Sequence, residues 1–138
     1  MPGKTRVIAS LVATLATAGL TTVAAAGTAA ADDPAVAPYA SYAAVVDKDG
    51  KLLRGKNVEQ AKRTDTGRYC VKFKAPFDAN TAIVSATLNF FAFPGSIRVS
   101  PGASKRCDHD ARSVYVAAVK LDNGAFVWSD AGFTVVAS

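Results

Sequence analysis

The sequence has few of the side chains that enzymes use for proton transfer and nucleophilic attack. It contains a single histidine, His109, a single glutamate, Glu59, and no Gly-x-Ser-x-Gly nucleophile motif. A serine triad or a small ribonuclease would require such groups to converge on one substrate. Nothing in the sequence brings Glu59 and His109 together. We therefore expect no catalytic residues and a protein that is not an enzyme; a secreted ribonuclease-like hydrolase using this pair is the third of three functional interpretations.

Potential metal ligands are equally sparse. The run Cys107-Asp108-His109-Asp110 places its side chains at adjacent positions of one loop, where they cannot readily converge on a single ion. Asp47-Lys48-Asp49-Gly50 begins like a calcium loop but lacks the later oxygen ligands and the distant glutamate. We interpret it as a hairpin turn. The sequence predicts neither a metal nor another cofactor.

The chain also lacks a strong excess of charge. Its formal net charge of +5 falls to +3 when Lys4 and Arg6 are left out as part of a leader segment. This value is too small to indicate a nucleic-acid partner. Basic residues gather between Lys48 and Lys74, whereas acidic residues predominate after Cys107. We interpret this distribution as solvated strand faces; the alternative is a surface that meets anionic wall polymers or phosphate.

The one long apolar run lies near the start of the chain and has the pattern of a signal peptide. Lys4 and Arg6 precede residues 7–26, which carry no ionisable side chain, and Ala29-Ala30-Ala31 fits a signal-peptidase site. The run is long enough for a membrane helix, but its many Ala, Thr and Gly residues make it weakly hydrophobic. We expect cleavage after Ala31 and a secreted, extracellular chain without a membrane span. Residues 32–38 would form a linker and residues 39–138 one domain.

Cysteine is rare, and its two positions predict a cross-link. Cys70 and Cys107 remain in a chain expected to be exported, where disulfides persist. A bridge over this separation would stabilise the fold by about 3 to 4 kcal/mol in the chain-entropy model. Neither cysteine belongs to a C-x-x-C motif, so a reactive thiol or a metal pair is the weaker alternative.

Hydrophobic residues alternate with a period of two through most of the remaining chain, and no convincing helix is present. The clearest case is residues 68–74, where Tyr69, Val71 and Phe73 share one face and Cys70 lies on the opposite, outer face. Residues 100–112 have loop composition and should lie over the sheet. The predicted strands cover residues 39–46, 51–54, 58–64, 68–74, 82–91, 97–99, 113–120, 126–128 and 133–136.

These segments predict an all-β fold. Turn signals such as Asp122-Asn123-Gly124 separate short strands at spacings of roughly 8 to 12 residues. We expect about eight strands in an antiparallel β-sandwich, immunoglobulin-like or similar, with a small β-barrel as the alternative.

The strand and turn patterns also carry a resemblance. Gly67-Arg68-Tyr69-Cys70-Val71, residues 82–88, a second cysteine in a loop, and the ending Phe133-Thr134-Val135-Val136 resemble small secreted β-rich proteins of uncharacterised function from high-GC Gram-positive bacteria, the actinobacterial type. The resemblance spans nearly all of the chain after residue 31. It implies a β-rich fold and an extracellular location, and it brings no active site with it.

The most aromatic stretch is Leu88-Asn89-Phe90-Phe91-Ala92-Phe93-Pro94. If Leu88 and Phe90 point inward, the alternation sends Phe91 and Phe93 to the outer face, where they would form a contact surface. A bulge that returns one ring to the core is the alternative. We expect Trp128 to lie in the core.

Together these observations favour a secreted, non-catalytic binding or structural module that contacts a cell-wall polymer or an extracellular protein. The second interpretation is a secreted inhibitor or effector that acts on another protein through the disulfide-anchored loop around Cys107.

Overall fold

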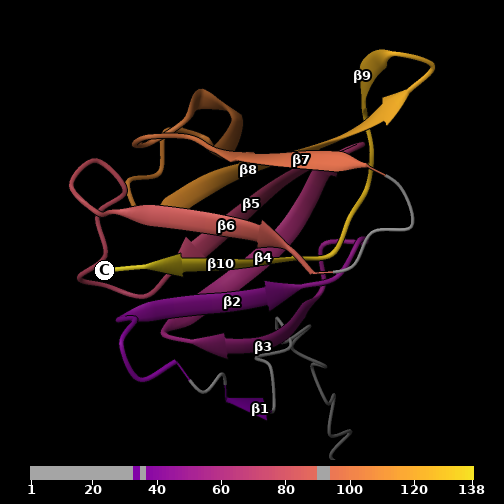
Figure 1. The fold of residues 1–138 in the computed structure, drawn as a ribbon. Helices are drawn as coiled ribbons and strands as arrows, with labels where there is room; N and C mark the ends of the chain where they lie inside the picture. The colour runs from indigo at the N-terminus through magenta and orange to yellow at the C-terminus, as the bar shows by residue number, and fades with distance from the viewer. Residues whose placement is uncertain (1–32, 35–36, 90–93) are drawn as a thin grey trace, which may run out of the picture.

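The computed structural model describes residues 33–34, 37–89 and 94–138. Within these residues the chain forms ten strands and one short 3-10 helix, and no α-helix. The strands are arranged in two sheets that face each other (Figure 1). The predicted antiparallel β-sandwich is thus confirmed, and the sheets do not close into the alternative barrel. No described segment is a helix long and apolar enough to cross a membrane.

The first sheet has the strand order β1-β3-β2-β10-β6, and the second has the order β4-β5-β8-β7 with β9 paired to β8. All pairs are antiparallel except the short contact between β1 and β3. The first sheet contains β1 (Asp33–Pro34), β2 (Tyr42–Val46), β3 (Leu52–Lys56), β6 (Val84–Leu88) and β10 (Phe133–Ala137). The second contains β4 (Val58–Asp65), β5 (Arg68–Phe73), β7 (Gly95–Val99), β8 (Ser113–Asp122) and β9 (Ala125–Trp128).

The core lies between the sheets and follows the alternation seen in the sequence. Tyr69, Val71 and Phe73 of β5 are completely buried, as predicted. Other members of this core come from both sheets and from the connection between β5 and β6: Ala44, Val46, Phe77, Ala79, Val114, Val116, Phe133, Val135 and Ala137. Burying a side chain of the Val or Phe class contributes roughly 1.5 to 3 kcal/mol, so this cluster is the main source of stability.

Two of the predicted hairpins form as the turn chemistry requires. The Asp47 carboxylate accepts hydrogen bonds from the backbone N–H groups of Asp49 and Lys51, at 2.9 and 2.8 Å. Asn123 and Gly124 both have positive φ, at 50° and 81°, which is the conformation that a two-residue hairpin turn demands. The strand predicted over residues 82–91 is described only as Val84–Leu88, because residues 90–93 lie outside the described part.

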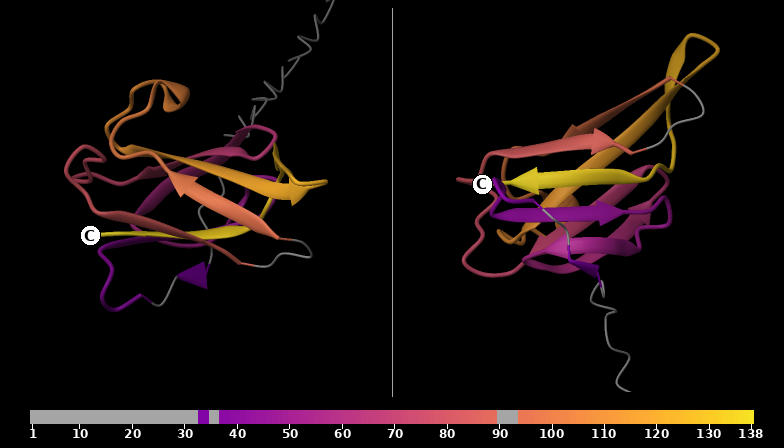
Figure 2. Two further views of the ribbon diagram at one scale, coloured as in Figure 1. Left: turned by 45° about the horizontal axis from the view of Figure 1, so that its top comes forward. Right: turned by 60° about the horizontal axis from the view of Figure 1, so that its bottom comes forward.

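The expectation that Trp128 lies in the core is wrong. Its side chain is 44% exposed, and Phe126, on the same strand, is 65% exposed. The reason is that β9 pairs only with the last four residues of β8, and the resulting hairpin extends beyond the end of the sandwich (Figures 1 and 2). A period-two pattern identifies the faces of a strand but does not show whether a second sheet covers it.

Candidate ligand-binding groove

The predicted disulfide between Cys70 and Cys107 is present, with an S–S distance of 1.98 Å and a Cα–Cα distance of 5.8 Å. Cys70 lies on the outer face of β5, opposite the core residues Tyr69 and Val71, as expected. Both cysteines are buried because the segment from residue 100 to residue 112 lies over the second sheet. This segment, here called the cysteine loop, contains the 3-10 helix η1 (Lys105–Cys107). The loop therefore stands on the outer face of the second sheet.

Ion pairs hold the cysteine loop on one side. The Lys72 Nζ lies 3.0 Å from the Asp110 carboxylate and 3.6 Å from Glu59, and Arg112 bonds to Glu59 at 2.8 Å. The backbone N–H of Arg112 and the ammonium of Lys72 hold the pKa of Asp110 below its ordinary value. A small cavity of about 140 Å³ opens here beside Lys62 and Asp108, whose charged groups also face each other at 4.0 Å. Because its charges are mutually paired, we interpret this cluster as an anchor for the loop.

A larger groove, of about 300 Å³, lies on the other side of the cysteine loop. Ala117 of β8 occupies the middle of its floor, and in the sheet register it stands between Arg98 of β7 and Arg68 of β5. The methyl group of Ala117 leaves a depression between these two long side chains. The lining residues are Arg98, Val99, Ser100, Ser104, Arg106, Tyr115, Ala117 and Trp128.

A guanidinium group lies over each of two aromatic rings of the groove. The Arg106 guanidinium lies 5.6 Å from the centre of the Tyr115 ring, and that of Arg68 lies 4.5 Å from the Trp128 ring. The second contact forms because β5 begins and β9 ends side by side along β8: Arg68 pairs with Ala117, and Trp128 pairs with Val119. Such stacking contributes about 0.5 to 2 kcal/mol and fixes the plane of the guanidinium.

The groove is positively charged. None of the described residues that line it is acidic. Arg98 and Arg106 are both exposed, and neither guanidinium forms an ion pair with any residue in the described ranges, whereas Arg68 at the border pairs with Asp65 at 3.2 Å. The groove thus presents two unpaired guanidinium groups next to an exposed tryptophan.

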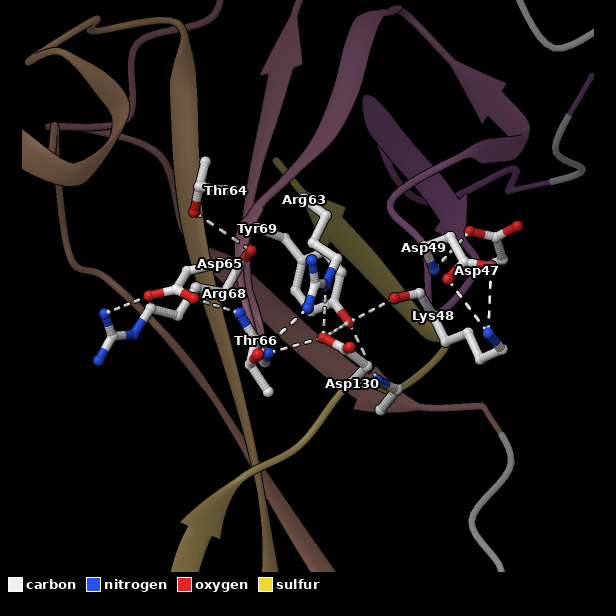
Figure 3. A network of polar contacts seen from close by, with 12 residues as sticks. Asp47, Lys48, Asp49, Arg63, Thr64, Asp65, Thr66, Arg68, Tyr69 and Asp130 are labelled. Atoms are coloured by element: carbon white, nitrogen blue, oxygen red, sulfur yellow. Dashed lines mark hydrogen bonds and ion pairs between the residues drawn. The ribbon is translucent and has the colours of Figure 1, made fainter.

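A separate polar cluster around Tyr69 and Asp130 serves the fold. The Asp130 carboxylate accepts a hydrogen bond from Arg63 Nε (Figure 3) and another from the Gly67 N–H, both at 2.8 Å. The Tyr69 hydroxyl donates to the Lys48 carbonyl at 2.8 Å and accepts from the Ala131 N–H at 3.0 Å. Burial raises the pKa of Tyr69 to about 12.

In the same surroundings the pKa of Asp130 shifts in the opposite direction to that of Tyr69. Its own burial favours the neutral acid, but the bonds from Arg63 and Gly67 prevail and lower its pKa. The cluster joins the β2–β3 turn, the β4–β5 turn and the segment before β10, and all of its central groups have partners. It therefore acts as a structural clasp.

The other sequence-predicted residues stay apart from the groove. Glu59 is engaged by Lys72 and Arg112, and His109 is an exposed residue of the cysteine loop. Among the described residues, no three His, Cys, Asp or Glu side chains form a group able to hold a metal ion. Phe91 and Phe93, the predicted contact surface, lie outside the described residues.

Sequence reasoning missed the groove residues. Alternation alone places Arg68, Tyr115 and Arg98 on outward faces, because the core takes Tyr69, Val116 and Val99. The alternation does not predict the strand register, which places Arg98, Ala117 and Arg68 side by side.

No protein-family model matches the chain, and neither a curated protein nor a solved structure matches it. The function has to be inferred from the geometry of the groove.

Proposed function

We propose that this protein is a secreted, non-catalytic binding module and that the groove beside the cysteine loop is its ligand site. The observation that carries the proposal is the pair of exposed guanidinium groups, Arg98 and Arg106, which lack an acidic partner in the described structure and flank an exposed tryptophan, Trp128. On the other side of the cysteine loop, Lys62, Lys72 and Arg112 are ion-paired. The unpaired cations at the groove are available for a ligand.

The chemistry of the groove points to a ligand that carries an anionic group and an apolar face. Guanidinium groups present donors in a planar fork that matches carboxylate, phosphate and sulfate groups. The exposed part of the Trp128 ring offers an apolar surface next to this fork. Ser100 and Ser104 at the rim add hydroxyl groups that can donate or accept hydrogen bonds.

A binding role also accords with the position of the two groups considered for catalysis. Glu59 is held by Lys72 and Arg112 on the far side of the cysteine loop from the groove. Neither Glu59 nor His109 lines the groove. The residues that do line it supply charge and surface for binding, without a base or an activated nucleophile.

The test is a titration of the folded protein with dextran sulfate, and with neutral dextran as the control polymer. We expect binding of the sulfated polymer only, and at least a tenfold weaker affinity for the double variant Arg98→Gln/Arg106→Gln. The matched control is Lys51→Gln/Arg54→Gln, which removes the same charge from exposed positions just before and within β3 of the other sheet. Equal losses in both variants would show non-specific charge attraction and would refute the groove as the site.

A further inference from the structure

The groove is one end of a longer surface. Alternate residues of β8 face outward, and β9 adds its own outward side chains in register: Trp128 beside Val119 and Phe126 beside Leu121. Four outward residues on this face, the half-buried Tyr115 and the exposed Trp128, Leu121 and Phe126, are here called the aromatic strip. The exposed fractions of the last three are large for apolar side chains, at 44% for Trp128, 42% for Leu121 and 65% for Phe126.

The aromatic strip is long enough for several units of an extended polymer. From Tyr115 to Leu121 the β8 strand advances six residues at about 3.3 Å each, which gives roughly 20 Å. This length exceeds that of the groove residues alone, because Leu121 and Phe126 lie beyond Trp128 on the hairpin that extends past the sandwich (Figure 2, right). A ligand that covers the strip must therefore be a chain.

Charge is concentrated at one end of the aromatic strip. Arg68, Arg98 and Arg106 surround the Tyr115 and Trp128 end. At the hairpin end, Lys120 and Asp122 form an ion pair at 3.7 Å. Because these two residues flank Leu121 in β8, their side chains lie on the opposite face of the strand. The strip thus offers cations at one end and apolar surface at the other.

The distribution of cations and apolar side chains along the aromatic strip indicates the chemistry of its ligand. We propose that the aromatic strip binds an anionic glycan, a sugar chain that carries carboxylate or phosphate groups at intervals; the inference rests on the proposed function of the groove. The anionic groups pair with Arg98 and Arg106, and the C–H faces of neighbouring sugar rings pack on Trp128 and Phe126.

A single-stranded nucleic acid fits the strip less well. It would bring a phosphate at every nucleotide, including those beside Leu121 and Phe126, where the described residues of this face supply no cation. A glycan whose anionic groups are widely spaced does not require a cation beside Leu121 and Phe126.

The experiment measures affinity for hyaluronan oligosaccharides of increasing length, which carry one carboxylate on every second sugar, and for a poly(glycerol phosphate) chain bearing sugar substituents. We expect affinity to rise with length until about 20 Å is covered and then to level off. The relative affinities of the two probes distinguish a carboxylate glycan from a phosphate glycan. Phe126→Ser should weaken binding of long oligosaccharides about fivefold and leave the disaccharide unchanged.

Ile83→Ser is the matched control, because Ile83 is an exposed apolar residue, at 78%, just before β6 of the other sheet. Equal affinities of the Phe126→Ser variant and the wild type for long chains would overturn the glycan strip while leaving the groove intact. Tighter binding of oligo(dT) or polyglutamate than of either glycan would overturn it as well. If the double variant Arg98→Gln/Arg106→Gln bound its ligands as tightly as the wild type, the proposed function itself would be refuted.

Discussion

At the scale of single residues, Tyr69 combines two roles that are usually separate. Its ring is completely buried and packs at 5.0 Å against Phe133 of the opposite sheet. Its hydroxyl satisfies the Lys48 carbonyl and the Ala131 N–H, which belong to two different connections. The side chain therefore joins the sheets through its ring and the loops through its oxygen.

Replacement of Tyr69 by phenylalanine should keep the packing and lose the hydrogen bonds. We expect the free energy of unfolding to fall by about 1 to 3 kcal/mol, because two backbone groups lose their partner. Urea denaturation of Tyr69→Phe measures this loss. Tyr39→Phe is the control, since Tyr39 is almost fully exposed and should leave stability unchanged. Identical unfolding curves for Tyr69→Phe and the wild type would contradict the clasp.

Tyr69 should also give the protein a distinct sensitivity to alkali. Burial raises its pKa from 10.0 to about 12, so the folded state keeps a proton that the unfolded state releases. The stabilisation is complete below pH 10 and is lost as the pH rises towards 12. The stability difference between wild type and Tyr69→Phe should therefore shrink over this interval. A constant difference between pH 9 and pH 12 would show that this hydroxyl does not titrate as the clasp requires.

At the scale of structural elements, the turn between β4 and β5 determines where β9 can lie. Gly67 has a φ of 64°, and a Cβ atom there would come 2.4 Å from the Ala118 carbonyl oxygen and 2.8 Å from the Ser129 nitrogen. The backbone of the turn thus passes directly against β8 and the end of β9. This close approach brings Arg68 beside Trp128.

Gly67→Ala should be more destabilising than Gly124→Ala. Both positions have positive φ, and in a residue with a side chain this conformation costs about 1 to 2 kcal/mol. Only Gly67 adds a clash with backbone atoms, because nothing lies within 4 Å of a Cβ at Gly124. Thermal unfolding of the two variants compares them directly. Equal melting temperatures would mean that the contact between the turn and β9 is loose.

The cysteine loop links stability to the shape of the groove, because it contributes Ser104 and Arg106 to the lining. The double variant Cys70→Ala/Cys107→Ala should lose about 3 to 4 kcal/mol of stability. It should also bind dextran sulfate more weakly at a temperature where it remains folded. Unchanged affinity would show that the ion pairs of Lys72 and Arg112 hold the loop without the disulfide.

At the scale of the whole molecule, the sequence allowed the two-layer fold to be predicted because its alternation is strong in the central strands. Tyr69, Val71 and Phe73 marked the inner face of β5 correctly, and the same reasoning placed Cys70 outside. The disulfide followed from the expected compartment and the even number of cysteines.

The site could not be predicted in the same way, for a geometric reason. Arg98, Ala117 and Arg68 come from three strands that are distant in sequence, and only the strand register brings them into one row. The error on Trp128 has a related origin, because the length by which β8 extends past β5 decides whether β9 is covered. The sequence pattern within one strand shows neither its register with the neighbouring strands nor the length by which it extends past them.

The position of Trp128 has a practical consequence. It is the single tryptophan of the sequence, and it lies at the edge of the groove with a guanidinium group 4.5 Å from its ring. All of the indole fluorescence of the protein therefore originates within the candidate site. A ligand that displaces water or shifts Arg68 there would change the intensity and wavelength of that emission, so the native chain carries its own optical reporter of binding.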